Sequence, residues 1–229
     1  MSEISQYDHW EPDETAHVFI VMNAGASMAG TPLARLNETV PELLGGLHQI
    51  GEHMEFPIEV HLLGYRTTPR WLYGTSAENG LPPLDVPFAD LSAASQADLS
   101  AALQELSRSL LSPDIRNSAK THVLVVLLTN GQEPMTPEVQ RQLHEVTDLL
   151  RAPKSRFHSG PMRMLTMLNC SDTPLPQELL DACSVEVVPN ADNFSWGEQE
   201  QAVPVALPAR EISRLLACVS DRCFTLYYS

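Results

Sequence analysis

Short runs of consecutive apolar residues alternate along this chain with stretches whose apolar residues recur every three or four positions. The runs His17–Met22, Val60–Tyr65 and His122–Thr129 are typical of strands buried on both faces. The stretches Leu33–Ile50 and Leu99–Leu110 have the apolar spacing of helices. Because strands joined by helices pair in parallel through right-handed crossovers, this pattern predicts an α/β fold. We expect a doubly wound, mostly parallel central sheet with helices on both faces.

The later part of the chain continues this alternation. We predict, in order, a helix at Val139–Leu150, a strand at Met162–Leu168, a helix at Pro176–Cys183, a strand at Val185–Val188 and a closing helix at Ile212–Val219. A weaker edge strand is expected at Arg70–Tyr73, with loops at 74–95 and 190–208.

The 229 residues fit a single domain with short tails. We expect an acidic N-terminal tail at residues 1–15, the domain at residues 16–220 and a C-terminal tail at residues 221–229.

Composition and charge indicate which kinds of partner, and which cellular location, to expect for this chain. The chain has 14 basic and 29 acidic residues and a net charge of −15. Proteins that bind nucleic acid usually neutralise its phosphates with clustered Lys and Arg, so we expect this chain not to bind nucleic acid. Its apolar runs are shorter than the ~20 residues that span a bilayer, and residues 1–15 lack the basic start and apolar middle of a secretory signal. The four cysteines form no CxxC pair. We therefore expect no membrane partner, a cytoplasmic location and reduced thiols.

Three polar segments follow predicted strands or open a predicted helix. They are Asn23–Met28, Ser95–Leu99 and Thr129–Glu133. In open α/β sheets, ligands bind beyond the carboxyl ends of the strands, near the point where the strand order reverses. We expect the three segments to converge there.

These segments resemble those of von Willebrand factor A (vWA) domains. Asn23–Met28 is similar to the family's D-x-S-x-S loop, and Gln96–Leu103 to its G-T-x-L-G-x-A-L helix start. Leu124–Pro134 resembles the strand that ends in L-L-T-D-G-x-P. Residues 162–188 resemble the bacterial branch of the family associated with tellurium resistance.

The resemblance implies a metal-ion-dependent adhesion site, which holds magnesium or manganese and binds an acidic group of a partner protein. At the five ligand positions this chain has Asn23, Gly25, Ser27, Ala97 and Asn130, so only the second serine is kept. Neutral amides do not replace carboxylate charge opposite a dication. We therefore expect a degenerate site with no metal and no other cofactor.

Two routes could restore a carboxylate at this site. Asp98 lies one residue from the threonine position, and deamidation of Asn130, which precedes Gly131, would create an aspartate where the family has one. The simpler interpretation of Asn130–Gly131 is a tight turn with positive φ.

The function that we expect is non-enzymatic: a cytoplasmic adaptor that binds another protein. The resemblance implies a kinase, a phosphatase or a stress-response protein as the partner. The predicted partner-binding residues are Asn23, Ala24, Ser27, Gln96, Asp98, Asn130 and Gln132, with Trp71 and Tyr73 at the rim.

Two alternatives stay open. The first is a metal-dependent vWA receptor that coordinates magnesium or manganese through an unusual ligand set. The second, less favoured, is a hydrolase with Ser27 as nucleophile, although the chain lacks G-x-S-x-G.

Overall fold

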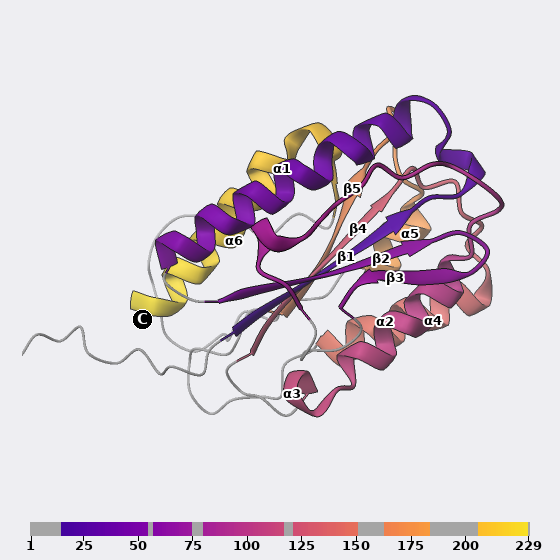
Figure 1. The fold of residues 1–229 in the computed structure, drawn as a ribbon. Helices are drawn as coiled ribbons and strands as arrows, with labels where there is room; N and C mark the ends of the chain where they lie inside the picture. The colour runs from indigo at the N-terminus through magenta and orange to yellow at the C-terminus, as the bar shows by residue number, and fades with distance from the viewer. Residues whose placement is uncertain are drawn as a thin grey trace, which may run out of the picture.

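The computed structural model describes residues 15–54, 57–74, 80–116, 121–150, 163–183 and 206–228. Its centre is a six-stranded sheet (Figure 1). The strands are β1 (Thr15–Asn23), β2 (Ile58–Tyr65), β3 (Pro69–Tyr73), β4 (Thr121–Thr129), β5 (Arg163–Asn169) and β6 (Ala206–Pro208).

The strand order is β3-β2-β1-β4-β5-β6, and every neighbouring pair is parallel except β2 and β3. The chain adds strands outward from β1 to β3, then returns to place β4 on the other side of β1. This reversal creates a switch point between β1 and β4. The predicted doubly wound, mostly parallel α/β fold is confirmed.

Helices cover both faces of the sheet (Figure 1). One face carries α1 (Thr31–Met54) and α6 (Ile212–Tyr228), and the other carries α2 (Leu99–Leu110), α4 (Pro137–Leu150) and α5 (Gln177–Cys183). The remaining helical turns are η1 (Ala26–Met28), η3 (Pro83–Asp85), α3 (Pro113–Arg116) and η4 (Ala209–Glu211). Among the described residues, no helix combines the length and the apolar character needed to cross a membrane.

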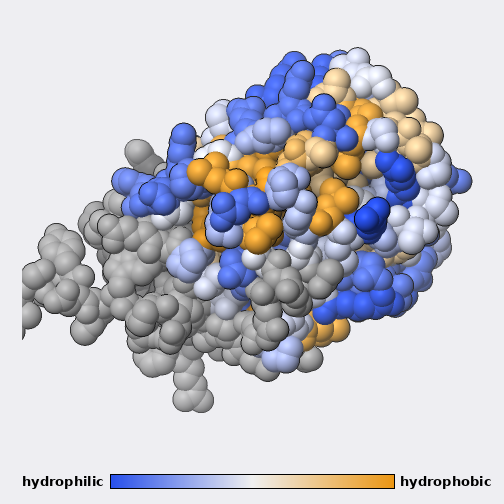
Figure 2. All heavy atoms as spheres, viewed as in Figure 1, coloured by the Kyte–Doolittle hydropathy of each residue, from blue (hydrophilic) through white to orange (hydrophobic). Residues whose placement is uncertain are grey.

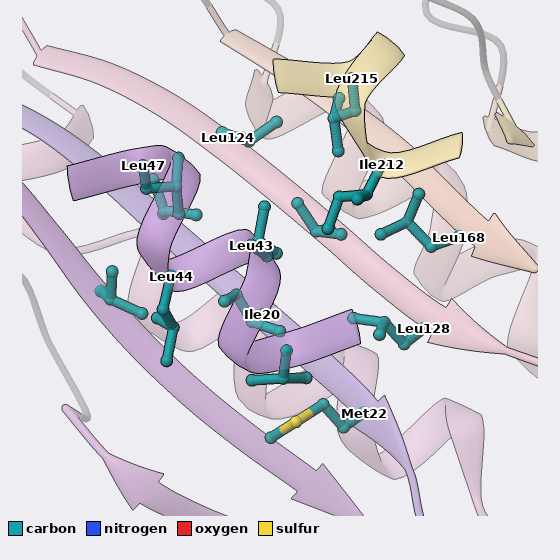
Figure 3. Close-up of a cluster of buried hydrophobic side chains, with 14 of the residues drawn as sticks. Ile20, Met22, Leu43, Leu44, Leu47, Leu124, Leu128, Leu168, Ile212 and Leu215 are labelled. Atoms are coloured by element: carbon teal, nitrogen blue, oxygen red, sulfur yellow. The ribbon is translucent and has the colours of Figure 1, made fainter. Parts of the chain in front are cut away.

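Alternation along β1 divides the core into two clusters. Ile20 and Met22 face α1 and α6, whereas Phe19 and Val21 face α2 and α4. On the first face, side chains of α1 such as Leu43 pack against β1, β4 and the start of α6 (Figure 3). Because both faces are covered, the central strands are continuous apolar runs, as the sequence indicates.

The C-terminal part differs from expectation in two places. β6 lies at Ala206–Pro208, inside the stretch 190–208 that we predicted to be a loop, and pairs with Met167–Asn169 of β5. Helix α6 continues to Tyr228, so the boundary drawn at residue 220 falls inside a helix. The strand predicted at Val185–Val188 lies outside the described residues.

The segment 80–91, within the predicted loop 74–95, packs on the α1 side of the sheet. Leu81 forms an isolated antiparallel bridge with Val60, and Phe88 and Leu91 contact the core cluster beneath α1. Leu84 stays 64% exposed. Apolar residues gather over the middle of the molecular face shown in Figure 2, with polar residues around them.

Candidate functional site

Backbone hydrogen bonds join the polar segments at the carboxyl ends of the strands. Ala26 N donates to Ser95 O (2.6 Å), and Ala94 N donates to Ala24 O (3.1 Å). Asp98 N donates to Arg66 O (2.8 Å), which links the same segment to the end of β2. The segments therefore meet beside the switch point, as the topology requires.

A buried carboxylate, Glu133, lies at the centre of this region and is only 8% exposed. It accepts hydrogen bonds from Asn23 Nδ2 (2.5 Å), Tyr65 Oη (2.6 Å) and Thr129 Oγ1 (2.8 Å). Thr129 Oγ1 also lies 2.8 Å from the second carboxylate oxygen. The donors come from the ends of β1, β2 and β4, so one acidic side chain connects three strands. A buried carboxylate needs such donors to replace its lost hydration.

The two ends of the Asn23 side chain have opposite partners. Its Oδ1 accepts from Gly25 N (2.7 Å), while its Nδ2 donates to Glu133. An aspartate in the same place could keep the first bond but would face Glu133 with a second carboxylate. Position 23 therefore needs an amide rather than a carboxylate, because only the amide can donate a hydrogen bond to Glu133.

Tyr65 and Thr129 both donate hydrogen bonds to Glu133 in this cluster. Burial, together with the adjacent Glu133 carboxylate, raises the pKa of the Tyr65 phenol well above its usual range. The phenol thus keeps its proton and acts as a donor. Thr129 Oγ1 accepts from Gly131 N (2.9 Å) while it donates to Glu133.

Asn130 is engaged on both sides of its side chain. Its Nδ2 donates to Ser27 O (2.7 Å), and its Oδ1 accepts from Gln132 N (3.2 Å). The next residue, Gly131, has φ of +71°, so the interpretation of Asn130–Gly131 as a turn with positive φ is confirmed. The amide therefore connects the β4 loop to the β1 loop.

Asp98 acts as the N-cap of α2. Its Oδ1 accepts from Ala101 N (3.0 Å), and the residue is exposed.

The residue at position 25 must be small, because the β1 loop packs closely against the segment that precedes α2. A Cβ on Gly25 would lie 2.7 Å from Ala97 Cβ. A serine at position 25 would require the Ala97 loop to move.

These residues do not fit the octahedral magnesium or manganese site that the resemblance implies. Hard dications take oxygen ligands with anionic charge. Both amide oxygens, of Asn23 and Asn130, already accept from backbone N–H groups, and positions 25 and 97 offer no side-chain oxygen. In the buried carboxylate of Glu133, Oε1 accepts from three protein donors, and Oε2 lies 2.8 Å from Thr129 Oγ1.

The predicted partner-binding residues separate by exposure. Asn23, Ala24 and Asn130 are buried and hold the loops together. The exposed members are Ser27, Gln96, Asp98 and Gln132. The two predicted rim residues, Trp71 and Tyr73, are half-buried on the edge strand β3. The Trp71 ring lies edge-on to the Phe19 ring, with 6.3 Å between the ring centroids.

Sequence reasoning missed the roles of Glu133 and Tyr65. Glu133 lies in the polar segment Thr129–Glu133 and Tyr65 ends the predicted strand Val60–Tyr65, but no local pattern distinguishes either residue from its neighbours. The available signal was a glutamate four residues after Thr129, at the end of the most apolar strand. Which strand end supplies its donors depends on strand order, and Tyr65 is 68 residues away along the chain.

No family model matches the chain, and no curated protein matches its sequence. Solved structures do match. One is proximal thread matrix protein 1 from the mussel byssus, at TM-score 0.56 and 13% identity, over 93% of this chain and 49% of that one. Another structure of the same protein, at TM-score 0.53, is described as having a zinc-occupied MIDAS motif, the metal-ion-dependent adhesion site.

The PilB minor pilin from Streptococcus sanguinis also matches, at TM-score 0.56 and 12% identity, over 96% of this chain and 63% of that one. A von Willebrand factor type A structure from Catenulispora acidiphila overlaps less closely, at TM-score 0.47 and 13% identity, over 74% of this chain and 36% of that one. The chain thus spans about half the length of the mussel protein. At these identities the likeness shows the fold alone, which is the doubly wound α/β fold described above.

Proposed function

We propose that this chain is a non-enzymatic protein-interaction domain that binds its partner through the carboxyl-end loops without a metal ion. The observation that carries the proposal is the Glu133 cluster. In it, Glu133 Oε1 accepts hydrogen bonds from the ends of three strands, so groups of the protein itself connect the carboxyl-end loops at this point.

The contact surface that we propose consists of the exposed members of the predicted set, Ser27, Gln96, Asp98 and Gln132. The Asn130 side chain bonds the loops of Ser27 and Gln132, and backbone hydrogen bonds hold the segment that carries Gln96 and Asp98. A loop that is already held in place loses little conformational entropy on binding. Amide and hydroxyl groups favour recognition by direct hydrogen bonds. Specificity would then come from shape and polar matching rather than from an ion bridge.

Thermal unfolding of the purified protein tests the metal-free part of the proposal. For protein first freed of bound metal, the melting temperature should be the same in EDTA and in millimolar magnesium or manganese. If the chain did bind the metal, a free metal concentration of a hundred times the dissociation constant would raise the free energy of unfolding by about 2.7 kcal/mol. A rise in melting temperature that Ser27→Ala or Asp98→Asn abolishes would instead favour a metal-dependent receptor with an unusual ligand set.

Partner binding tests the surface. A partner isolated by affinity capture with EDTA present should bind Gln96→Ala and Gln132→Ala at least tenfold more weakly than the unchanged chain. The matched control is Gln140→Ala, an exposed glutamine on α4. If both loop variants bind as well as the control, the partner uses another surface.

The finer identity of the partner rests on the sequence resemblance alone. We propose a kinase, a phosphatase or a stress-response protein of a bacterial, tellurium-resistance-like system, acting in the cytoplasm. Mass spectrometry of the captured partner and fractionation of the source cells test these two points.

A further inference from the structure

A second group of polar side chains lies near the amino ends of the strands, away from the Glu133 cluster. His17 is on β1, and Glu59 and His61 are on the neighbouring strand β2. In the parallel register His17 pairs with Glu59, and Phe19 pairs with His61. His17 precedes Asn23 by six residues of extended chain, which places the two groups about 20 Å apart along β1.

Three possible ligand atoms converge in this group. His17 Nδ1 lies 3.2 Å from His61 Nε2 and 3.6 Å from Glu59 Oε2, and all three atoms are within 4.8 Å of one another. In a tetrahedral site with zinc–ligand bonds of about 2.0–2.2 Å, ligand atoms are about 3.3–3.6 Å apart. The distances of 3.2 and 3.6 Å are close to that separation.

The surroundings hold these side chains in place and keep them largely from water. Both histidines are buried, and the His61 ring stacks on Phe19 at 4.5 Å. Glu59 Oε2 is buried although the residue is part-exposed, and it has no hydrogen-bond partner. A buried carboxylate oxygen without a donor is costly unless another group, such as a cation, compensates it.

The two ring nitrogens of His61 have different surroundings. Its Nε2 faces His17 Nδ1, and a ligating imidazole binds the ion through its unprotonated nitrogen. The other ring nitrogen, Nδ1, has no hydrogen-bond partner, so it can carry the ring proton. An ion would take the place of the hydrogen bond between His17 Nδ1 and His61 Nε2.

Gly80 leaves room beside the ligand atoms. A Cβ there would lie 2.8 Å from Glu59 Oε2 and 3.0 Å from His61 Nε2. Any larger residue would crowd the space in which an ion and its fourth ligand would lie. The adjacent residue Leu81 bridges to Val60, which holds this backbone against β2.

We propose that His17, Glu59 and His61 bind one divalent transition-metal ion of the zinc type, with water as the fourth ligand. Two imidazoles and a carboxylate select zinc, cobalt or nickel over magnesium or calcium, which prefer oxygen ligands. The ion would connect β1 to β2 beside Gly80. This site is independent of the proposed partner surface and of the carboxyl-end loops.

The test uses the full chain, treated with a chelator and then freed of it, and titrated with Zn²⁺ and Co²⁺. We expect one equivalent of Zn²⁺ to bind with micromolar or tighter affinity. Co²⁺ should give the intense visible absorption of a four-coordinate site, and Mg²⁺ should not compete. Glu59→Gln, which preserves size at a part-exposed position, should weaken Zn²⁺ binding at least tenfold, and His61→Asn should abolish the cobalt spectrum.

The matched control is His144→Gln, which removes an exposed histidine on α4 and should leave both titrations unchanged. Circular dichroism of the metal-free variants checks that each one folds. The proposal is overturned if the unchanged chain binds no zinc at micromolar concentration. It is also overturned if folded Glu59→Gln and His61→Asn bind as the unchanged chain does.

Discussion

At the scale of single residues, the identity of position 23 depends on its partner at position 133. Asn23→Asp would place a second carboxylate against Glu133, where the amide nitrogen now lies 2.5 Å from its oxygen. We expect a loss of about 2–4 kcal/mol in the free energy of unfolding at pH 7.5, because two buried carboxylates repel and one loses its donor. Urea denaturation measures this loss.

The control for this prediction is the exchange of charge between the two positions. Glu133→Gln alone should cost about 1 kcal/mol, because the side-chain oxygen can still accept hydrogen bonds. The double variant again has one carboxylate facing one amide, so it should be more stable than Asn23→Asp alone. Additive losses in the double variant would show that the two side chains do not act as a pair.

Buried histidine makes the fold sensitive to acid. Burial, with Arg163 nearby, lowers the pKa of His122 from 6.5 to about 4. Since the unfolded chain binds this proton first, the stability is complete above about pH 6.5 and falls as the pH drops toward 4. His122→Gln should therefore reduce the slope of unfolding free energy between pH 6 and pH 5 by about 1 kcal/mol per pH unit. Urea denaturation at several pH values measures the slope, and an unchanged slope in His122→Gln would contradict the prediction.

At the scale of elements, two adjacent glycines in α1 have different surroundings. A Cβ on Gly45 would meet no atom within 4 Å, whereas a Cβ on Gly46 would lie 2.2 Å from Leu216 Cδ1 of α6. Gly46 thus permits the close approach of α1 and α6 that covers one face of the sheet.

Alanine at these two positions should act differently. Gly45→Ala should raise the unfolding free energy by about 0.5–1 kcal/mol, because alanine is the better helix former and nothing obstructs it. Gly46→Ala should give less, since the Leu216 side chain must move to make room. Thermal unfolding of the two variants side by side checks this order, and equal stabilisation would contradict the close contact of α1 and α6.

At the scale of the whole molecule, charge repulsion opposes folding. The net charge is −15, and exposed ion pairs such as Arg141–Glu138 join neighbours on one helix, where each pair contributes little. Salt screens both effects, and at this net charge we expect the repulsion to be the larger of the two. The melting temperature should therefore rise by a few degrees between 20 and 300 mM sodium chloride. A fall would show that attractive pairs dominate.

The fold followed from local patterns. The run Val123–Leu128 is apolar at every position, which is typical of a strand covered on both faces, and its alternation with helices predicted a mostly parallel sheet. The positions of the carboxyl-end loops followed from that arrangement. The degenerate metal site inferred from the amide at position 23 stays a prediction.

The tertiary structure decided how the buried polar groups are paired. Tyr65 and Glu133 meet across 68 residues, and His17 and His61 across 44. Hydrophobic periodicity is a local property, but a buried polar atom takes its partner from whichever strand becomes its neighbour. β6 shows the same limit, since only pairing with β5 distinguishes its three residues from a loop.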